Sequence, residues 1–244
     1  MNVARLITAY FFLYVCMVPL FAQAALIPTQ NLLVEIRGTP EYPRPEEEVA
    51  LTARATKDVD TLTYVWSLNG EEYASGRGLT RVTVSAGVLG EKKEIGVTLI
   101  DDTGNLRGVR SYTILPAEVD VLWEADANVP PLYEGRALAI RESTITALAV
   151  PHFMRENVSL FAEGLLYRWT VDGKAVSGGP YGRTTLTFEP PFFGRSFTVS
   201  VIVETPDGLY AGEGSATITL SEPDIVVYEN RPLVGLWLNR PIVK

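Results

Sequence analysis

Cysteine is almost absent from this chain of 244 residues, and Cys16 is its one example. Cys16 lies in an N-terminal segment that we expect to be removed, so the mature chain has no disulfide available. Its domains must therefore be held together by burial alone, which units of about 100 residues can manage. An exported chain without cysteine is more typical of bacteria than of animals. The glycosylation sequon Asn157-Val-Ser159 is then interpreted as a chance match.

Histidine is equally scarce, with His152 as its one example. A zinc site needs several His or Cys ligands, which this inventory cannot supply. The sequence also lacks a Gly-x-Ser-x-Gly nucleophile elbow. A catalytic role for His152 would need a nucleophile or a carboxylate brought to it by the fold. We expect His152 to be a loop or edge residue, and we predict no catalytic residue and no cofactor.

Positive charge is outweighed by negative charge, because 21 Lys and Arg residues face 29 Asp and Glu residues. The formal net charge is −8, and long runs of a single sign are missing. Nucleic acids and anionic membranes both require a concentrated basic patch. The composition therefore argues against either as a partner.

The first 24 residues are predicted to be a signal peptide. Arg5 precedes an apolar run over residues 6–22, and Ala22-Gln23-Ala24 places small residues where signal peptidase requires them. We expect cleavage after Ala24 and a secreted, cell-surface or envelope location. The alternative is an uncleaved N-terminal anchor, and this segment would then be the chain's membrane contact.

Apolar and polar residues alternate with period two through most of the remaining chain, as in strands with one face in water. In Tyr64-Val-Trp66-Ser-Leu68, the Tyr, Trp and Leu side chains point to one side. No amphipathic helical window of useful length competes with this pattern. Further alternating runs cover residues 81–85, 119–123, 144–148, 185–188, 197–201 and 216–220. The sequence therefore predicts an all-β fold.

One phrase occurs twice, as Tyr64-Val-Trp66-Ser-Leu68-Asn69-Gly70 and as Tyr167-Arg-Trp169-Thr-Val171-Asp172-Gly173. Asn-Gly and Asp-Gly are strong hairpin signals because both residues tolerate positive φ. Repetition at this period predicts two copies of a domain-sized unit, with Trp66 and Trp169 in their cores. We place the first β-sandwich at 25–117 and the second at 118–222. The prolines at 40, 43 and 45 are expected on an edge or in the lead-in at the start of the first unit.

The repeated phrase resembles the PKD (polycystic kidney disease) domain and its immunoglobulin-like relatives in bacterial exported proteins. The match includes a later strand and turn, Ile95-Gly-Val-Thr-Leu-Ile-Asp101-Asp-Thr-Gly104, and it covers both units. Ser67-Leu68 and Thr170-Val171 replace the core of the usual Trp-Asp-Phe-Gly-Asp-Gly phrase. The resemblance implies two tandem immunoglobulin-like sandwiches that serve as an extracellular spacer, adhesion or binding module.

Acidic residues cluster at matching turns of the two units, and calcium needs only oxygen ligands. The candidate ligands are Asp58, Asp60, Asp101, Asp102, Asn105, Glu204 and Asp207. None of these clusters has the full spacing of a calcium loop. Asp and Asn also cap backbone amides in ordinary hairpin turns. We therefore favour the turn interpretation and predict no metal site.

Aromatic residues outside the repeated phrase are candidates for a carbohydrate platform or a protein contact. They are Trp123, Tyr133, Tyr181, Phe192, Phe193, Tyr210 and Trp237. Gly and Pro in segments 178–182 and 190–194 would keep the rings of Tyr181, Phe192 and Phe193 on loops. Such residues otherwise pack in cores. The sequence leaves the partner open between a protein and a glycan.

Residues 223–244 resemble the opening of another unit. Tyr228-Glu-Asn-Arg231-Pro-Leu233 echoes Tyr133-Glu-Gly-Arg136-Ala-Leu138. We expect this segment to be a terminal strand that pairs with the second unit, and the alternative is the start of a third unit in a longer protein. The favoured function is a non-enzymatic binding, adhesion or spacer module. The alternatives are an envelope subunit that assembles by terminal strand pairing and a carbohydrate-binding module.

Overall fold

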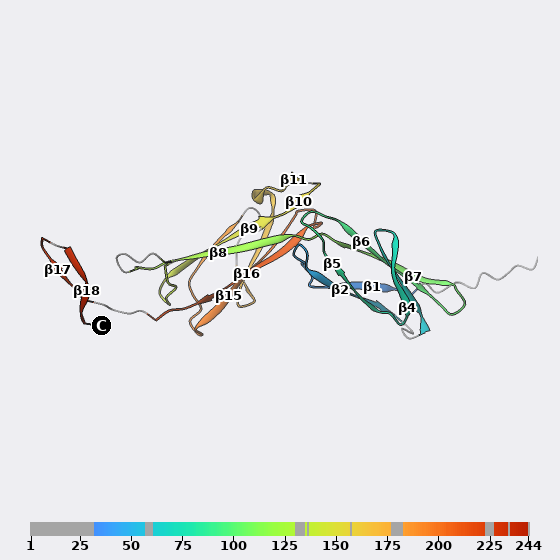
Figure 1. Cartoon of the computed structure of the whole chain (residues 1–244), viewed down its shortest axis with the longest axis horizontal. Helices are drawn as coiled ribbons and strands as arrows, with labels where there is room; N and C mark the ends of the chain where they lie inside the picture. The colour runs from blue at the N-terminus through green and yellow to red at the C-terminus, as the bar shows by residue number, and fades with distance from the viewer. Residues whose placement is uncertain are drawn as a thin grey trace, which may run out of the picture. The chain divides into compact units, whose positions relative to one another are not determined.

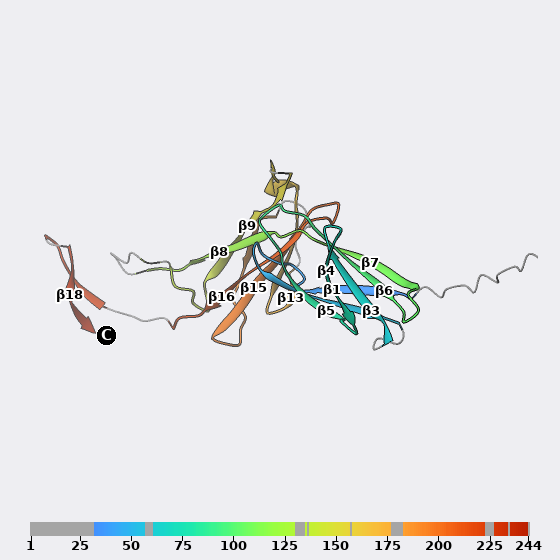
Figure 2. The same cartoon turned by 45° about the vertical axis from the view of Figure 1, so that its right-hand side comes forward.

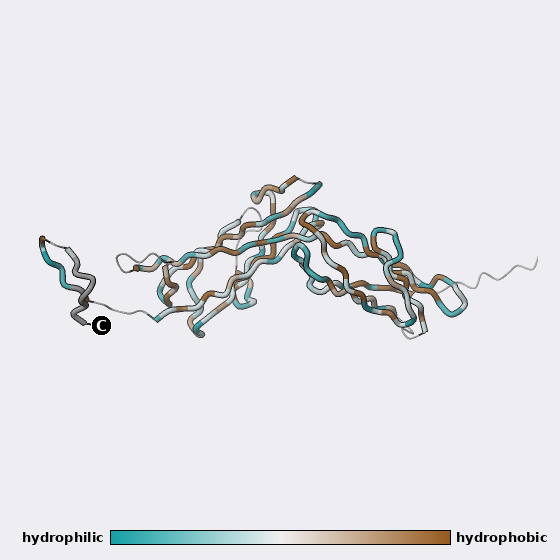
Figure 3. Tube along the Cα trace, in the orientation of Figure 1, coloured by the Kyte–Doolittle hydropathy of each residue, from teal (hydrophilic) through white to brown (hydrophobic). Residues whose placement is uncertain are grey.

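The computed structural model of the chain describes residues 32–56, 61–129, 135, 137–156, 158–176, 183–222, 227–233 and 235–243, without the side chains of 228 and 236–243. Within these ranges the fold is built of antiparallel strands, and the one helical element is a 3-10 turn, η2, at Ala162–Gly164 (Figure 1). Hydrophobic and hydrophilic residues alternate along the strands (Figure 3). The all-β prediction is confirmed. No helix in the described ranges has the length and apolar character needed to cross a bilayer.

The first sandwich consists of a three-stranded sheet in the order β1-β2-β5 and a four-stranded sheet in the order β4-β3-β6-β7 (Figure 2). Its strands are β1 (Val34–Thr39), β2 (Glu48–Ala55), β3 (Thr63–Leu68), β4 (Glu71–Arg77), β5 (Arg81–Ser85), β6 (Lys93–Ile100) and β7 (Leu106–Ile114). One core cluster contains buried residues from both sheets, such as Leu51 of β2 and Val97 of β6.

The second sandwich has the same topology, with one sheet in the order β14-β9-β8 and the other in the order β13-β12-β15-β16. Its strands are β8 (Glu118–Asp126), β9 (Thr144–His152), β12 (Leu166–Val171), β13 (Lys174–Ala175), β14 (Thr185–Phe188), β15 (Ser196–Glu204) and β16 (Ala211–Thr219). A small hairpin, β10 (Met154–Arg155) and β11 (Val158–Ser159), follows β9. The repeated strand order confirms two tandem β-sandwiches.

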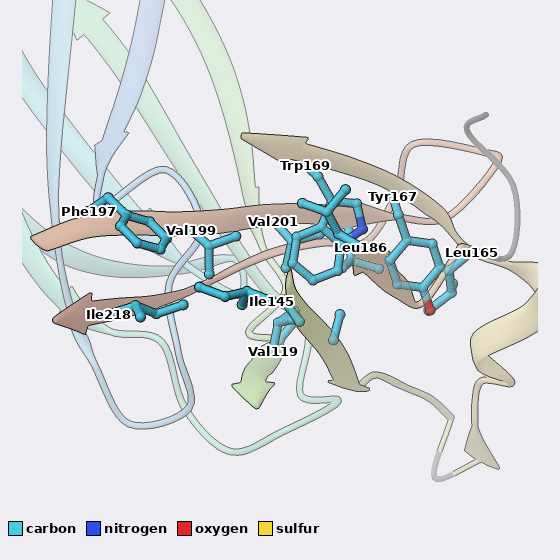
Figure 4. Close-up of a cluster of buried hydrophobic side chains, with 14 of the residues drawn as sticks. Val119, Ile145, Leu165, Tyr167, Trp169, Leu186, Phe197, Val199, Val201 and Ile218 are labelled. Carbon is cyan, nitrogen blue, oxygen red and sulfur yellow. The ribbon is translucent and has the colours of Figure 1, made fainter. Parts of the chain in front are cut away.

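The repeated Tyr and Trp residues lie in the two cores. Tyr64 and Trp66 are fully buried in the first sandwich, and Tyr167 and Trp169 are 3% and 6% exposed in the second. In the second core, Tyr167 and Trp169 lie beside Val201 and Leu186, with Leu165 beyond Tyr167 (Figure 4). The indole N–H of each Trp donates to a backbone carbonyl, that of Leu79 at 2.8 Å and that of Arg183 at 3.1 Å. The prediction that both Trp residues belong to cores is confirmed.

The two Asx-Gly turns also have matching geometry. Asn69 and Gly70 have φ values of 51° and 87°, and Asp172 and Gly173 have 47° and 71°. These values suit a two-residue hairpin turn, which needs positive φ at both positions. Each Asx side chain also accepts a hydrogen bond from the next strand of its sheet, at 2.9 Å from the Glu94 N–H or the Thr198 N–H. The Asx residue therefore both permits the turn and ties it to the sheet.

The prolines at 40, 43 and 45 follow the edge strand β1, as one of the two predicted positions required. They belong to the connection between β1 and β2 and not to the lead-in of the first sandwich. The lead-in position is wrong because β1 is short and only weakly alternating in sequence, with Ile36 as its one buried residue. A proline-rich connection at the end of an edge strand is compatible with the missing N–H groups of proline.

The C-terminal segment forms its own hairpin. Strand β17 (Val227–Arg231) pairs antiparallel with β18 (Gly235–Val243), and the two make a separate two-stranded sheet. The prediction of a strand paired with the second unit is therefore wrong. Gly235, at a φ of 84°, lets the chain reverse directly after Arg231, so the segment supplies its own partner strand. Of the predicted echo at 133–138, Tyr133, Glu134 and Arg136 lie outside the described residues.

Candidate functional site

Two loops meet at one end of the second sandwich. We call this end, where β8 begins, the entry end. Glu118, the first residue of β8, pairs with His152, the last residue of β9, so loop 153–165 starts at this end. Leu166 at the start of β12 pairs with Glu204 at the end of β15, which brings loop 205–210 to the same end. In immunoglobulin-like sandwiches, loops gathered at one end are a common place for binding.

The two loops enclose an apolar groove of about 390 Å³, which we call the entry-end groove. It is lined by Arg155, Leu160, Phe161, Gly164, Leu165, Thr205, Pro206 and Asp207. The ring of Phe161 is 84% exposed, and Val158 and Leu209 on the same two loops are 63% and 61% exposed. Apolar residues exposed beside an apolar groove are typical of an interaction site.

The polar groups of the groove are already paired with one another. The Arg155 guanidinium lies 2.6 Å from the Asp207 carboxylate and 5.2 Å from the centre of the Tyr210 ring. The other carboxylate oxygen of Asp207 accepts hydrogen bonds from the Thr205 hydroxyl at 2.5 Å and the Leu209 N–H at 3.1 Å. The bonds from Thr205, Leu209 and Arg155 lower the pKa of Asp207 from 3.8 to about 2. What the groove offers a partner is therefore mainly apolar surface.

Loop 153–165 is held by a buried tyrosine and a buried phenylalanine. The Tyr167 hydroxyl donates to the Ala162 carbonyl at 2.9 Å, and burial raises the pKa of Tyr167 to about 12. Phe153 is 2% exposed, and its carbonyl accepts from the Leu160 N–H at 2.9 Å. Phe161 directly precedes the η2 turn, so its ring is presented from a fixed backbone.

The other end of the second sandwich, which we call the exit end, carries a pair of exposed phenylalanine rings. Phe192 and Phe193 are 78% and 84% exposed, and their rings meet edge to face at 5.0 Å. Arg141 braces this loop by donating to the carbonyls of Pro191 at 3.4 Å, of Gly194 at 3.1 Å, and of Phe192. The prediction that loop 190–194 presents exposed rings is confirmed, and we call these two rings the aromatic platform.

The remaining aromatic candidates do not join either surface. Tyr210 is 8% exposed in the second core, and Trp123 is partly buried against that core. These two residues follow the core-packing alternative. Tyr133, Tyr181, the segment 178–182 and the side chain of Trp237 lie outside the described residues.

The acidic turns are occupied by their own hydrogen bonds. One carboxylate oxygen of Asp101 accepts from the Thr103 N–H, the Thr103 hydroxyl and the Asn105 N–H at 3.0, 2.6 and 2.9 Å. Arg107 lies 2.6 Å from its other oxygen, and the bonds from Thr103, Asn105 and Arg107 hold the pKa of Asp101 well below its usual range. Asp102 and Glu204 pair with arginines as well.

Asp101 and Asp207 thus cap backbone amides of their own turns. In the described ranges, no group of three or more His, Cys, Asp or Glu side chains is placed to hold a metal ion. Asp58, Asp60 and the sequon residue Asn157 lie outside those ranges, so the expectations for them stay predictions.

His152 is the last residue of β9, the central strand of its sheet, and loop 153–165 follows it directly. Its Nε2 lies 3.3 Å from a carboxylate oxygen of Asp120 on the neighbouring strand β8. Their side chains are 44% and 52% exposed, so both remain in contact with water.

Sequence reasoning missed Phe161 in the lining of the entry-end groove, and it missed the exposed Val158 and Leu209 on the same two loops. A signal was available in Val158-Ser-Leu-Phe161-Ala, where apolar residues crowd a stretch that lacks the period of a strand. The sequence could not show that loop 205–210 would lie beside it, because that proximity follows from strand order and register.

Comparison with known proteins identifies no family, since no family model and no curated protein matches the chain. Three solved structures show limited similarity to this chain. Fibronectin(III)-like modules of Clostridium thermocellum CbhA have 9% identity over 78% of this chain and 98% of that chain, with a TM-score of 0.35. Three N-terminal domains of the bacteriophage RB49 outer capsid protein Hoc have 17% identity over 81% and 62%, with a TM-score of 0.32. The central fibronectin-III array of RIM-binding protein has 10% identity over 80% and 77%, with a TM-score of 0.26.

Proposed function

We propose that this chain is a non-enzymatic, exported binding module that contacts a protein partner through the entry-end groove. The observation that carries the proposal is the exposed Phe161 in the lining of an apolar groove, with Val158 and Leu209 exposed on the same two loops. The two sandwiches would act as a scaffold that presents these loops. Among the binding, adhesion and spacer roles that the sequence favours, this proposal chooses binding and assigns it to the entry-end groove.

The chemistry of the groove favours a protein partner over a glycan. Sugar recognition needs polar side chains that are free to bond several hydroxyl groups, with an aromatic face to stack on. Here Arg155, Asp207 and Thr205 bond to one another, and the rest of the lining is apolar. An aliphatic or aromatic side chain of a partner protein would fill such a groove and bury Phe161, as aromatic anchors do at interfaces.

The extracytoplasmic location is part of the proposal. It rests on the predicted signal peptide of residues 1–24 and on the absence of cysteine from the rest of the sequence. If the signal peptide is cleaved as predicted, the protein recovered from the medium or the cell envelope begins at Ala25. N-terminal peptide mass spectrometry would establish this. Recovery of an intact residue 1–24 segment in the membrane fraction would support the uncleaved anchor instead.

The binding function is tested with the fluorescently labelled exported chain and source cells that lack its gene. We expect saturable binding that is lost after protease treatment of the cells, survives glycosidase treatment, and falls at least about tenfold in affinity for a Phe161→Ser, Leu209→Ser variant. Tyr73→Ser is a matched control, because Tyr73 is also exposed but lies on β4 of the first sandwich.

Three results would overturn the proposal. Binding lost on glycosidase treatment would assign the surface to a glycan. Equal affinity of the double variant and the Tyr73→Ser control would move the contact away from the groove. Finally, the absence of saturable binding would leave the chain with the role of a spacer.

Assembly by terminal strand pairing has less support in the structure. It requires a C-terminal strand whose backbone groups are available to a neighbouring subunit. In the described residues, β17 and β18 pair with each other along most of their length, so each strand keeps only its outer edge for another chain.

A further inference from the structure

The C-terminal hairpin is too small to be stable by itself. Strands β17 and β18 form a sheet of two strands, and an isolated two-stranded hairpin is marginally stable in water. Its sequence is nevertheless rich in apolar residues, with Leu236, Trp237 and Leu238 in succession and Ile242-Val243 near its end. Leu233 at its turn is 99% exposed. A hairpin of this composition needs a surface to pack on.

The chain enters this hairpin from the exit end of the second sandwich, which carries the aromatic platform. Ser196 at the start of β15 pairs with Thr219 at the end of β16, so loop 189–195 and the departing chain lie at the same end. Directly after β16, the Leu220 N–H donates to the Arg195 carbonyl at 2.8 Å. The chain that leaves β16 is therefore hydrogen-bonded to Arg195, which follows Phe193 by two residues in the sequence.

The connection between the sandwich and the hairpin is short. Residues 223–226 separate Glu222 from Val227, so the hairpin begins within about 17 Å of the sandwich even if this connection is fully extended. Such a tether holds the hairpin at a millimolar effective concentration near the platform. Any other occupant would have to compete with it.

The platform itself has the properties of a docking surface. Phe192 and Phe193 place two large apolar rings in water, although burial of such rings is strongly favourable. The three carbonyls bound by Arg141 fix their loop before anything docks, which lowers the entropic cost of docking.

We propose that the aromatic platform of Phe192 and Phe193 is the docking site for the chain's own C-terminal hairpin, residues 227–243. The hairpin packs on the platform as a β-structured cap at the exit end of the second sandwich. This inference concerns the end opposite the entry-end groove, so it holds or fails independently of the proposed partner binding.

Hydrogen exchange of the exported chain, followed by mass spectrometry at two protein concentrations, tests this proposal. We expect the amides of β17 and β18 to be protected equally at both concentrations. In a Phe192→Ser, Phe193→Ser variant they should exchange at least about tenfold faster. Phe161→Ser is the matched control, since that ring is as exposed as Phe193 but lies at the entry end, and it should leave the hairpin unchanged.

A second measurement leaves both phenylalanines in place. In a chain that ends at residue 226, chymotrypsin should cleave after Phe192 or Phe193 several-fold faster than in the full chain. Protection of β12 and β15 in every variant shows that the sandwich itself stays folded.

Four results would overturn the proposal. These are unprotected hairpin amides in the unsubstituted chain, equal hairpin exchange with and without the two phenylalanines, and equal cleavage of both chain lengths. The fourth is protection that rises with protein concentration, which would place the hairpin on a second copy of the chain.

Discussion

Replacing Trp66 by alanine should destabilise the first sandwich selectively. Trp66 lies in β3, opposite Ala74 of β4 and Val97 of β6, and it is fully buried. Its indole N–H donates to the Leu79 carbonyl at 2.8 Å, so it also ties β3 to the segment that precedes β5. Trp66→Ala removes the largest fully buried side chain among the described residues and leaves that carbonyl without its donor.

The expected magnitude follows from these contacts. A buried Trp→Ala substitution costs about 3–5 kcal/mol, and loss of the indole hydrogen bond is part of that cost. A domain of this size is stable by roughly 5–15 kcal/mol, so the first sandwich would lose a large share of its free energy of unfolding. Trp66→Phe keeps a ring but loses the N–H donor, and we expect it to cost about 1–3 kcal/mol.

The assay must separate the two sandwiches, because a chain of two domains need not unfold in one transition. Hydrogen exchange in increasing urea reports the free energy of opening for each strand. Trp66→Ala should lower the free energy of opening for β3 and β6 and leave that of β12 and β15 unchanged. Trp169→Ala should lower it for β12 and β15 and leave β3 and β6 unchanged. A first sandwich that loses less than about 1 kcal/mol would refute the core assignment. Equal losses in both sandwiches would refute their independence.

Three further predictions concern the polar contacts. The pKa of Asp207 is lowered from 3.8 to about 2, so its carboxylate stabilises the second sandwich fully above pH 3.8 and loses this effect as the pH falls through 2. Asp207→Asn should therefore remove this part of the acid unfolding curve, as measured by circular dichroism. Arg141→Lys should speed hydrogen exchange in loop 190–194 several-fold, because a lysine ammonium cannot reproduce the guanidinium fork that reaches three carbonyls. Calcium should leave the melting temperature of either sandwich unchanged, since Arg107 and three local donors already occupy Asp101; a rise on titration would contradict this.

The sandwich fold was predictable because several levels of the sequence agree. Period-two alternation places Tyr64 and Trp66 on the same face of a strand, and the following Asn69-Gly70 suits only a tight turn. The second copy repeats the Tyr and Trp of the strand and replaces the Asn of the turn by Asp172, which serves the same turn. Turn chemistry and strand period are local properties, so a single sequence reveals them.

The binding surfaces were harder to predict because they depend on contacts between distant segments. Phe192 and Phe193 were identified as loop residues from the flanking Pro and Gly, yet nothing local indicates that Arg141 would reach three carbonyls of their loop. The groove at Phe161 needs loop 205–210 beside it, and that depends on the register of β12 with β15. The C-terminal error has a similar origin, because its strand signal was correct and its partner strand was misplaced.

The two copies of the fold differ at the places where we propose contacts. At the turn between the last two strands, the first sandwich has the polar Asp101-Asp-Thr-Gly-Asn105, whereas the second has Thr205-Pro-Asp-Gly-Leu-Tyr210 with Leu209 exposed. At the loop that follows β5 or β14, the first copy exposes one aliphatic residue, Val88, whereas the second exposes the two aromatic rings of Phe192 and Phe193. Residues that the repeat keeps are those that the fold requires. Large apolar residues that one copy alone exposes are not explained by folding, so they are the positions at which binding should be sought first.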